Sequence, residues 1–134
     1  MSLVNVRAAL EKRLATITPP IDTVPENTDY TPVTGTPHQR VYLLAAEPDN
    51  TEFGSMFQEH GIFQVTLAYP LQNGAGEATA RAELIRAAFR RGTSLTQAGD
   101  VIVIEKTPEI GPGLPGDAFY ELPVRVRWYV NVTS

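Results

Sequence analysis

Cysteine is absent from this chain of 134 residues, which excludes disulfides, thiolate metal sites and cysteine nucleophiles. A basic excess is lacking as well, because 11 lysines and arginines stand against 15 acidic residues and give a formal net charge of -4. Proteins that read a nucleic-acid sequence normally carry a basic surface. We therefore expect no sequence-specific nucleic-acid partner.

Long apolar runs are also missing. The opening stretch MSLVNVRAALEKRLATI carries charges throughout, so it fits neither a signal peptide nor a membrane span. We expect a protein made in the cytoplasm, with no membrane partner. With 43% hydrophobic and 19% charged residues the composition is typical of a globular protein, and the length predicts a single domain over residues 1–134.

Two helices are predicted from apolar residues spaced three and four apart. The first covers about residues 3–16 and ends at TPP, because proline lacks the amide hydrogen that a helix needs. The second covers about residues 76–91 and ends at Gly92, a suitable C-terminal cap. Alanines along its apolar stripe imply close packing onto a sheet.

Alternating apolar and polar residues predict strands near 40–47, 62–70, 100–106 and 120–132. The segments 48–61 and 108–118 are rich in turn residues and are expected as loops. Residues 18–38 contain five prolines and are expected as an extended loop with room for a short strand. This order of elements predicts an α+β domain, with a mostly antiparallel (mixed) sheet of about four to five strands and two helices packed on one face.

No motif in the sequence supports catalysis. GPGLPG at 111–116 matches a dinucleotide fingerprint, but its prolines remove two of the amides that such a site offers, and a strand follows it. His38 and His60 are expected in loops and lack the spacing of metal ligands. We predict no catalytic residue, no cofactor and no metal, and a protein that is not an enzyme.

The last predicted strand offers a surface for a partner instead. Its even positions are apolar and predict a buried face, whereas its odd positions include Arg125, Arg127 and Tyr129, which are residue types common at interfaces. An equally supported alternative is that these three side chains only cover the solvent face of the sheet. Pro123 cannot donate to a ladder, which predicts an edge, a bulge or a position just outside the sheet.

Most of the chain resembles, in order and spacing, the tail terminator or tail completion proteins of long-tailed bacteriophages, similar to lambda-type, prophage-encoded members. The resemblance rests on the opening VRAALEKRLATI, the proline-rich segment, ATARAELIRAAFRRG and the closing FYELPVRVRWYV. It implies a structural virion protein of the tail, made in the bacterial host cytoplasm. It further implies a hexameric ring that caps the tail tube, ends its polymerisation and offers a docking surface for the head connector.

The partners that this resemblance implies are further copies of the chain, the tail tube protein and the head–tail connector protein. Loops would then make the contacts, and the candidate residues from them are His38, Phe53, Met56, Phe57 and Leu114. Another phage connector or baseplate adaptor is an alternative. A monomeric module that binds a small ligand is a second one, and it would need a concave pocket with polar groups.

Overall fold

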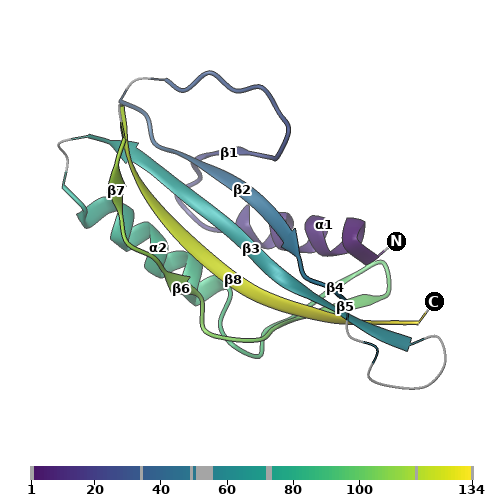
Figure 1. The fold of residues 1–134 in the computed structure, drawn as a ribbon. Coiled ribbons are helices and arrows are strands. Elements are labelled where there is room, and N and C mark those ends of the chain that lie inside the picture. The colour runs from purple at the N-terminus through teal and green to yellow at the C-terminus, as the bar shows by residue number, and fades with distance from the viewer. Residues whose placement is uncertain are drawn as a thin grey trace.

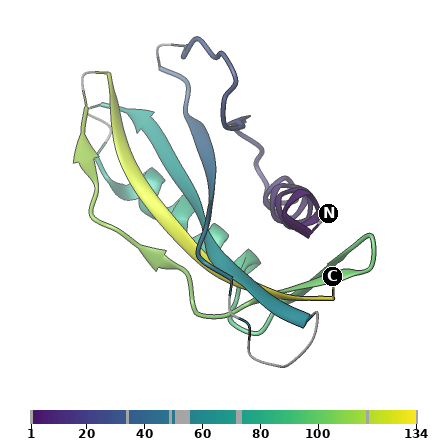
Figure 2. The same cartoon turned by 45° about the vertical axis from the view of Figure 1, so that its right-hand side comes forward.

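The computed structural model describes residues 2–33, 35–48, 50, 56–71, 74–116 and 118–133. Two helices, α1 (Ser2–Leu14) and α2 (Gly76–Ala88), lie on one face of a curved mixed sheet (Figures 1 and 2). The strands are β1 (Asp22–Val24), β2 (His38–Ala45), β3 (Met56–Pro70), β4 (Ser94–Gln97), β5 (Asp100–Ile104), β6 (Glu109–Ile110), β7 (Leu114–Pro115) and β8 (Phe119–Thr133). The predicted α+β class and the placement of both helices are confirmed.

Two long strands form the centre of the sheet. β3 and β8 each have 15 residues and pair antiparallel along their whole length, from Met56 opposite Thr133 to Pro70 opposite Phe119. The sheet order is β1-β2-β3-β8-β5-β4, and β6 and β7 pair with β8. Among the strands that the structure describes, β1 and β2 alone run parallel. Because strands twist, such a long ribbon curves, and the helices fill its hollow side (Figure 2).

The prediction of four to five strands was wrong, because the sheet has eight strands within the described residues. β1 is the short strand for which the segment 18–38 left room. The additional strands β4, β6 and β7 have two to four residues each, too few for an alternating pattern to show. β6 and β7 lie in the glycine- and proline-rich segment that was expected as a loop. Both pair with β8, so a long neighbouring strand supplies the order that their own sequence does not.

Strand β3 begins at Met56, earlier than the predicted start at residue 62. The turn signals of segment 48–61 therefore did not predict its last six residues correctly, because pairing with the end of β8 keeps them extended. Both histidines were expected in loops, and this was wrong. His60 lies inside β3, and His38 is the first residue of β2.

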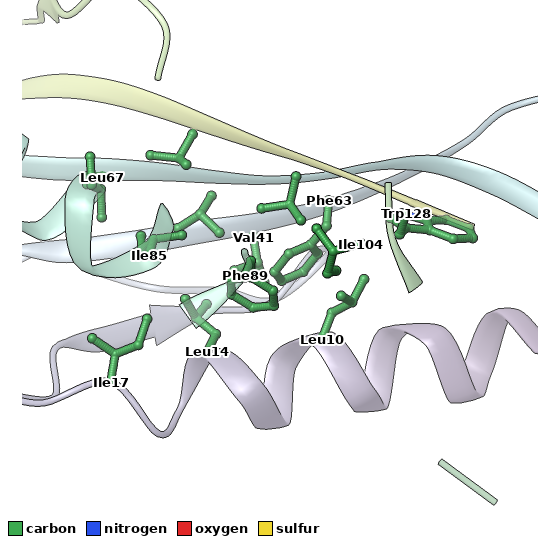
Figure 3. Packing of buried hydrophobic residues seen from close by; sticks show 14 of the residues in the cluster. Leu10, Leu14, Ile17, Val41, Phe63, Leu67, Ile85, Phe89, Ile104 and Trp128 are labelled. Carbon is green, nitrogen blue, oxygen red and sulfur yellow. The ribbon is translucent and has the colours of Figure 1, made fainter. Parts of the chain in front are cut away.

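The core lies between the sheet and the helices, as the apolar patterns predicted. The even positions of β8 from Leu122 to Val130 are buried, and each odd position between them is half-buried. Figure 3 shows that Leu10 and Leu14 of α1 point towards Phe63 of β3 and Phe89, which follows α2. The ring centroids of Phe63 and Phe89 are 6.2 Å apart.

Helix α2 ends at Ala88, three residues before its predicted end. Phe89 is fully buried, and its amide donates to the Ile85 carbonyl as the last helical bond. Gly92 has a φ of +85° and donates to the carbonyl of Ile104, 2.8 Å away. Gly92 therefore turns the chain into the β4–β5 hairpin and does not cap the helix directly.

Pro123 lies within β8, at a level where β8 pairs with β3 on one side and lies between the pairings of β6 and β7 on the other. It stands opposite Thr66 of β3, while its carbonyl points the other way and accepts from the Gly111 amide at 2.9 Å. In a strand, the amide and carbonyl of one residue face the same side. The missing amide hydrogen therefore faces the interruption between β6 and β7, the kind of local edge that the sequence predicted.

Candidate assembly surfaces

The face of the sheet turned away from the helices is called the open face here, and it carries the odd positions of β8 and the even positions of β3. Arg125 and Arg127 lie on it, and both pair with Glu109 of β6. The nitrogen-to-oxygen distances are 3.8 Å from Arg125 and 3.3 Å from Arg127. Arg125 also donates from Nε to Oε1 of Gln64, at 3.3 Å.

Two guanidinium groups thus share one carboxylate, which leaves the cluster with an excess of one positive charge. The side chains are 34% exposed for each arginine and 50% for Glu109, so water screens these pairs and each stabilises the fold by only about 1 kcal/mol or less. No local pattern predicts that Glu109 meets the arginines, because the contact depends on the pairing of β6 with β8. The cluster is therefore available as a weakly held, net positive surface.

Tyr129 continues the row of Arg125 and Arg127 along the open face. It stands opposite His60 of β3 and Val103 of β5, and it is half-buried. The prediction that the three odd-position side chains share one face is confirmed. Their contact with a partner stays a prediction.

His38 is 2% exposed and holds the segment after β1 against the sheet. Its ring centroid lies 5.1 Å from that of Tyr30 and 4.9 Å from that of Phe119, the latter in an edge-to-face arrangement. Burial lowers the pKa of His38, and the charge of Arg40 adds to this effect, whereas the carboxylates of Glu121 and Asp22 oppose it. No local pattern could have linked these aromatic residues, because they come from three separate parts of the chain.

The remaining candidates lie towards opposite ends of the sheet. Met56, 42% exposed, starts β3, and the half-buried Phe57 follows it. Leu114, 65% exposed, lies in β7 opposite Glu121 near the other end of β8. Phe53 lies outside the described residues. The structure therefore does not bring the loop candidates together with the arginine row.

Several hollows lie on the surface of the molecule. One of about 550 Å³ is lined by Glu83, Arg86, Ala87, Arg90, Arg91 and Thr107. Another of about 330 Å³ is mostly apolar and is lined by Leu3, Val4, Arg7, Leu43 and Ala45. Within the described ranges, no helix is long and apolar enough to cross a membrane, and no three histidine, aspartate or glutamate side chains gather as metal ligands would.

Comparison with known proteins identifies the family of this chain. A family model described as phage tail terminator protein matches residues 5–128. Among solved structures 14 chains match, and one of them aligns with 100% of this chain and 99% of its own, at a TM-score of 0.79 and 26% sequence identity. No curated protein matches. The chain belongs to the phage tail terminator family, with a structural role in the tail of the virion.

Proposed function

We propose that this protein forms a hexameric ring that caps the phage tail tube, ends its polymerisation and provides the surface on which the head connector docks. The observation that carries the proposal is the family match over residues 5–128. A cap of this kind acts by contact alone, so its function lies in surfaces and not in a catalytic centre. The protein is accordingly not an enzyme.

The shape of the sheet supports a protein that makes contacts at both of its ends. A ribbon of 15-residue strands spans about 50 Å, and exposed apolar groups lie near both of its ends. Leu114 is at one end, and the hollow between Leu3, Val4 and Ala45 is at the end where β2 stops. A ring with its axis along the ribbon would present one of these groups on each of its two faces, one for the tube and one for the connector.

The test is polymerisation of purified tail tube protein with and without the terminator. We expect shorter tubes, each capped at one end in negative-stain micrographs. A terminator concentration far below that of the tube protein should be enough, because one ring ends one tube. Leu114→Asp should weaken the contact at one ring face, and Leu84→Asp, at a 43% exposed position on α2, is the matched control. An unchanged distribution of tube lengths with excess terminator would refute the capping function.

A further inference from the structure

Within the described ranges, one end of the sheet has two edges that pair with no further strand. β2 ends at Ala45, opposite Gly61, so the first residues of β3, from Met56 to Glu59, have β8 on one side and no described strand on the other. On the far side the sheet ends with β4. At this level the sheet is therefore a four-stranded piece, β3-β8-β5-β4, whose two outer edges face opposite directions (Figure 1).

The backbone hydrogen bonds show which groups point outwards from these edges. The His60 carbonyl accepts from the Ala46 amide at 2.9 Å, on the side away from β8. Since backbone groups alternate sides along a strand, Met56 and Gln58 also direct their amides and carbonyls away from β8. These groups form the free edge of β3.

The same alternation applies to β4. The Thr93 carbonyl faces β5, where it accepts from Ile104 at 2.9 Å, and Leu95 stands opposite Ile102. Ser94 and Thr96 therefore direct their amides and carbonyls outwards. Each edge thus presents two residues, two apart, with donors and acceptors free to pair.

The edge of β4 lacks the features that keep other edges from pairing. β1, the other outer strand, lies between Pro20 and Pro25, which limits strand addition there. The sequence of β4, SLTQ, contains neither proline nor charge. It is open to a further strand.

Helix α1 forms a wall beside the edge of β4. A groove of about 270 Å³ runs between them. It is lined by Ala9, Lys12 and Arg13 of the helix, by Thr16 in the turn after it and by the four residues of β4. Lys12 reaches across it and donates from Nζ to Oε1 of Gln97, at 3.0 Å. The lining contains two cationic side chains and no acidic one, so it favours an extended segment that carries a carboxylate.

The free segment of β3 has the complementary chemistry. Its side chains on the helix side of the sheet belong to Phe57 and Glu59, one apolar and one acidic. Oε2 of Glu59 is buried and has no hydrogen-bond partner within the described structure. A strand with this alternation would place Phe57 against Leu95 and Ala9, and Glu59 near the cations of α1.

We propose that β4 of one copy pairs antiparallel with residues 56–59 of β3 in the next copy, so that the sheet continues from subunit to subunit around the ring. The inference rests on the proposed ring, whose axis would run along the strands. Three antiparallel pairings separate β3 from β4, so the two strands run in opposite directions within a chain. Rotation about such an axis preserves both strand direction and sheet face, and it brings the two edges together as an antiparallel pair. Because the contact joins two different surfaces, it can repeat and close a ring.

The register follows from the groups that are still free. Thr96 pairs with Met56, and Ser94 pairs with Gln58, which sets Leu95 opposite Phe57. A shift by two residues would require Ser94 to pair with His60, whose carbonyl already accepts from Ala46. In the same register Thr96 lies between Met56 of the next copy and Val101 of β5, so two exposed apolar side chains, 42% and 46% exposed, flank it on the open face.

Disulfide trapping tests this register, because the native chain has no cysteine. In Thr96→Cys with Met56→Cys, opposed residues of neighbouring copies would lie about 5.5 Å apart at Cα, within reach of a disulfide. Inside one copy the two positions lie about 14 Å apart across three strand spacings. Oxidation at high protein concentration, and on tail tubes, should yield a ladder of linked chains up to the ring.

The matched control is Thr96→Cys with Gln64→Cys. Gln64 lies on the same strand and face as Met56, but β2 covers it. We expect little cross-linking from this pair. Equal cross-linking of the two pairs, or none from the test pair in either condition, would overturn the proposal.

Proline substitutions give a second, independent readout. Thr96→Pro and Gln58→Pro each remove one outward amide without touching the inner ladder, and each should raise the concentration needed for ring formation by about tenfold or more. Mixed together, the two variants retain one intact pair of edges and should form dimers but no rings. Circular dichroism and unfolding midpoints establish that both variants fold. Rings from either variant at the wild-type concentration would refute edge pairing.

Edge pairing and capping can fail separately. If the native protein shortens tubes but the test pair does not cross-link, the edges do not pair, and the capping function stands. If cross-linked rings form but tubes grow to their usual length, the edges pair, and the capping function falls.

Discussion

Trp128 of β8 lies across from Gly61 of β3, and the indole occupies the space beside the glycine where any other residue would place a side chain. A Cβ on residue 61 would come within 2.9 Å of Cζ2 of Trp128 and closer still to the backbone carbonyl of Leu44. Trp128 is fully buried, and the carbonyl belongs to a paired strand. Neither neighbour can easily move away.

Gly61→Ala should therefore destabilise the protein, by about 1–3 kcal/mol, the usual cost of overpacking a core. The measurement is urea unfolding followed by circular dichroism. Gly76→Ala is the control, because a Cβ there meets nothing within 4 Å and the residue opens α2. Equal unfolding midpoints for the two variants would show that the Gly61 site can relax.

Ala98→Asn should stabilise the β4–β5 hairpin. Ala98 and Gly99 have φ angles of +50° and +89°, and a turn with positive φ at both central residues favours asparagine followed by glycine. The gain in the free energy of unfolding should be about 0.5–1 kcal/mol, because alanine is strained in this region. Ala98→Val should lower stability instead, since β-branching increases the strain. Thermal unfolding of the three proteins measures both changes, and the opposite order would contradict the assigned turn.

His38 should make the protein less stable as the solution becomes acidic. Burial lowers the pKa of His38 from its usual 6.5, so below that pH the unfolded chain binds more protons than the folded chain. Stability is therefore lost as pH falls through about 6.5 towards the folded pKa. His38→Gln should lose less stability than the native protein between about pH 7.5 and pH 5.5.

Comparing the two proteins cancels the titration of other groups. Glu11 acts in the opposite direction, because burial raises its pKa and the folded chain then holds that proton more tightly. This effect is present in both proteins. Parallel stability curves, measured by urea unfolding at each pH, would show that His38 titrates normally.

Arg125→Glu combined with Arg127→Glu should block assembly without unfolding the chain. The change places two more carboxylates beside Glu109 and reverses the charge of the open face at that point. Both native ion pairs are exposed to water, so the loss of each should cost only about 1 kcal/mol of stability or less. Light scattering with tail tubes measures assembly, and circular dichroism measures folding.

Arg90→Glu with Arg91→Glu is the matched control, since it changes the net charge equally at exposed positions after α2. We expect this variant to assemble as the native protein does. Normal assembly of the open-face variant, with an unchanged circular dichroism spectrum, would show that Arg125 and Arg127 only cover the solvent face of the sheet.

Local patterns carried the prediction of the fold where an element was long enough to display a period. The even positions of β8 and the stripes of both helices were assigned correctly to the core, because burial of one face demands apolar residues at the matching spacing. The strands β4, β6 and β7 had no such signal. Residues 56–61 were predicted as part of a loop, because the turn residues of the whole segment 48–61 hid the apolar and polar alternation of a strand.

For the candidate surfaces, the sequence placed Arg125, Arg127 and Tyr129 on one face, because a period of two does not depend on what lies beside the strand. It could not supply Glu109 as their partner, the burial of His38 between Tyr30 and Phe119, or the two free edges at the end of the sheet. These depend on contacts between residues far apart in the chain and on where each neighbouring strand stops. The sequence by itself determined which side of each long element is buried, and only the tertiary structure decided what faces it, because strand pairing joins segments that no local pattern relates.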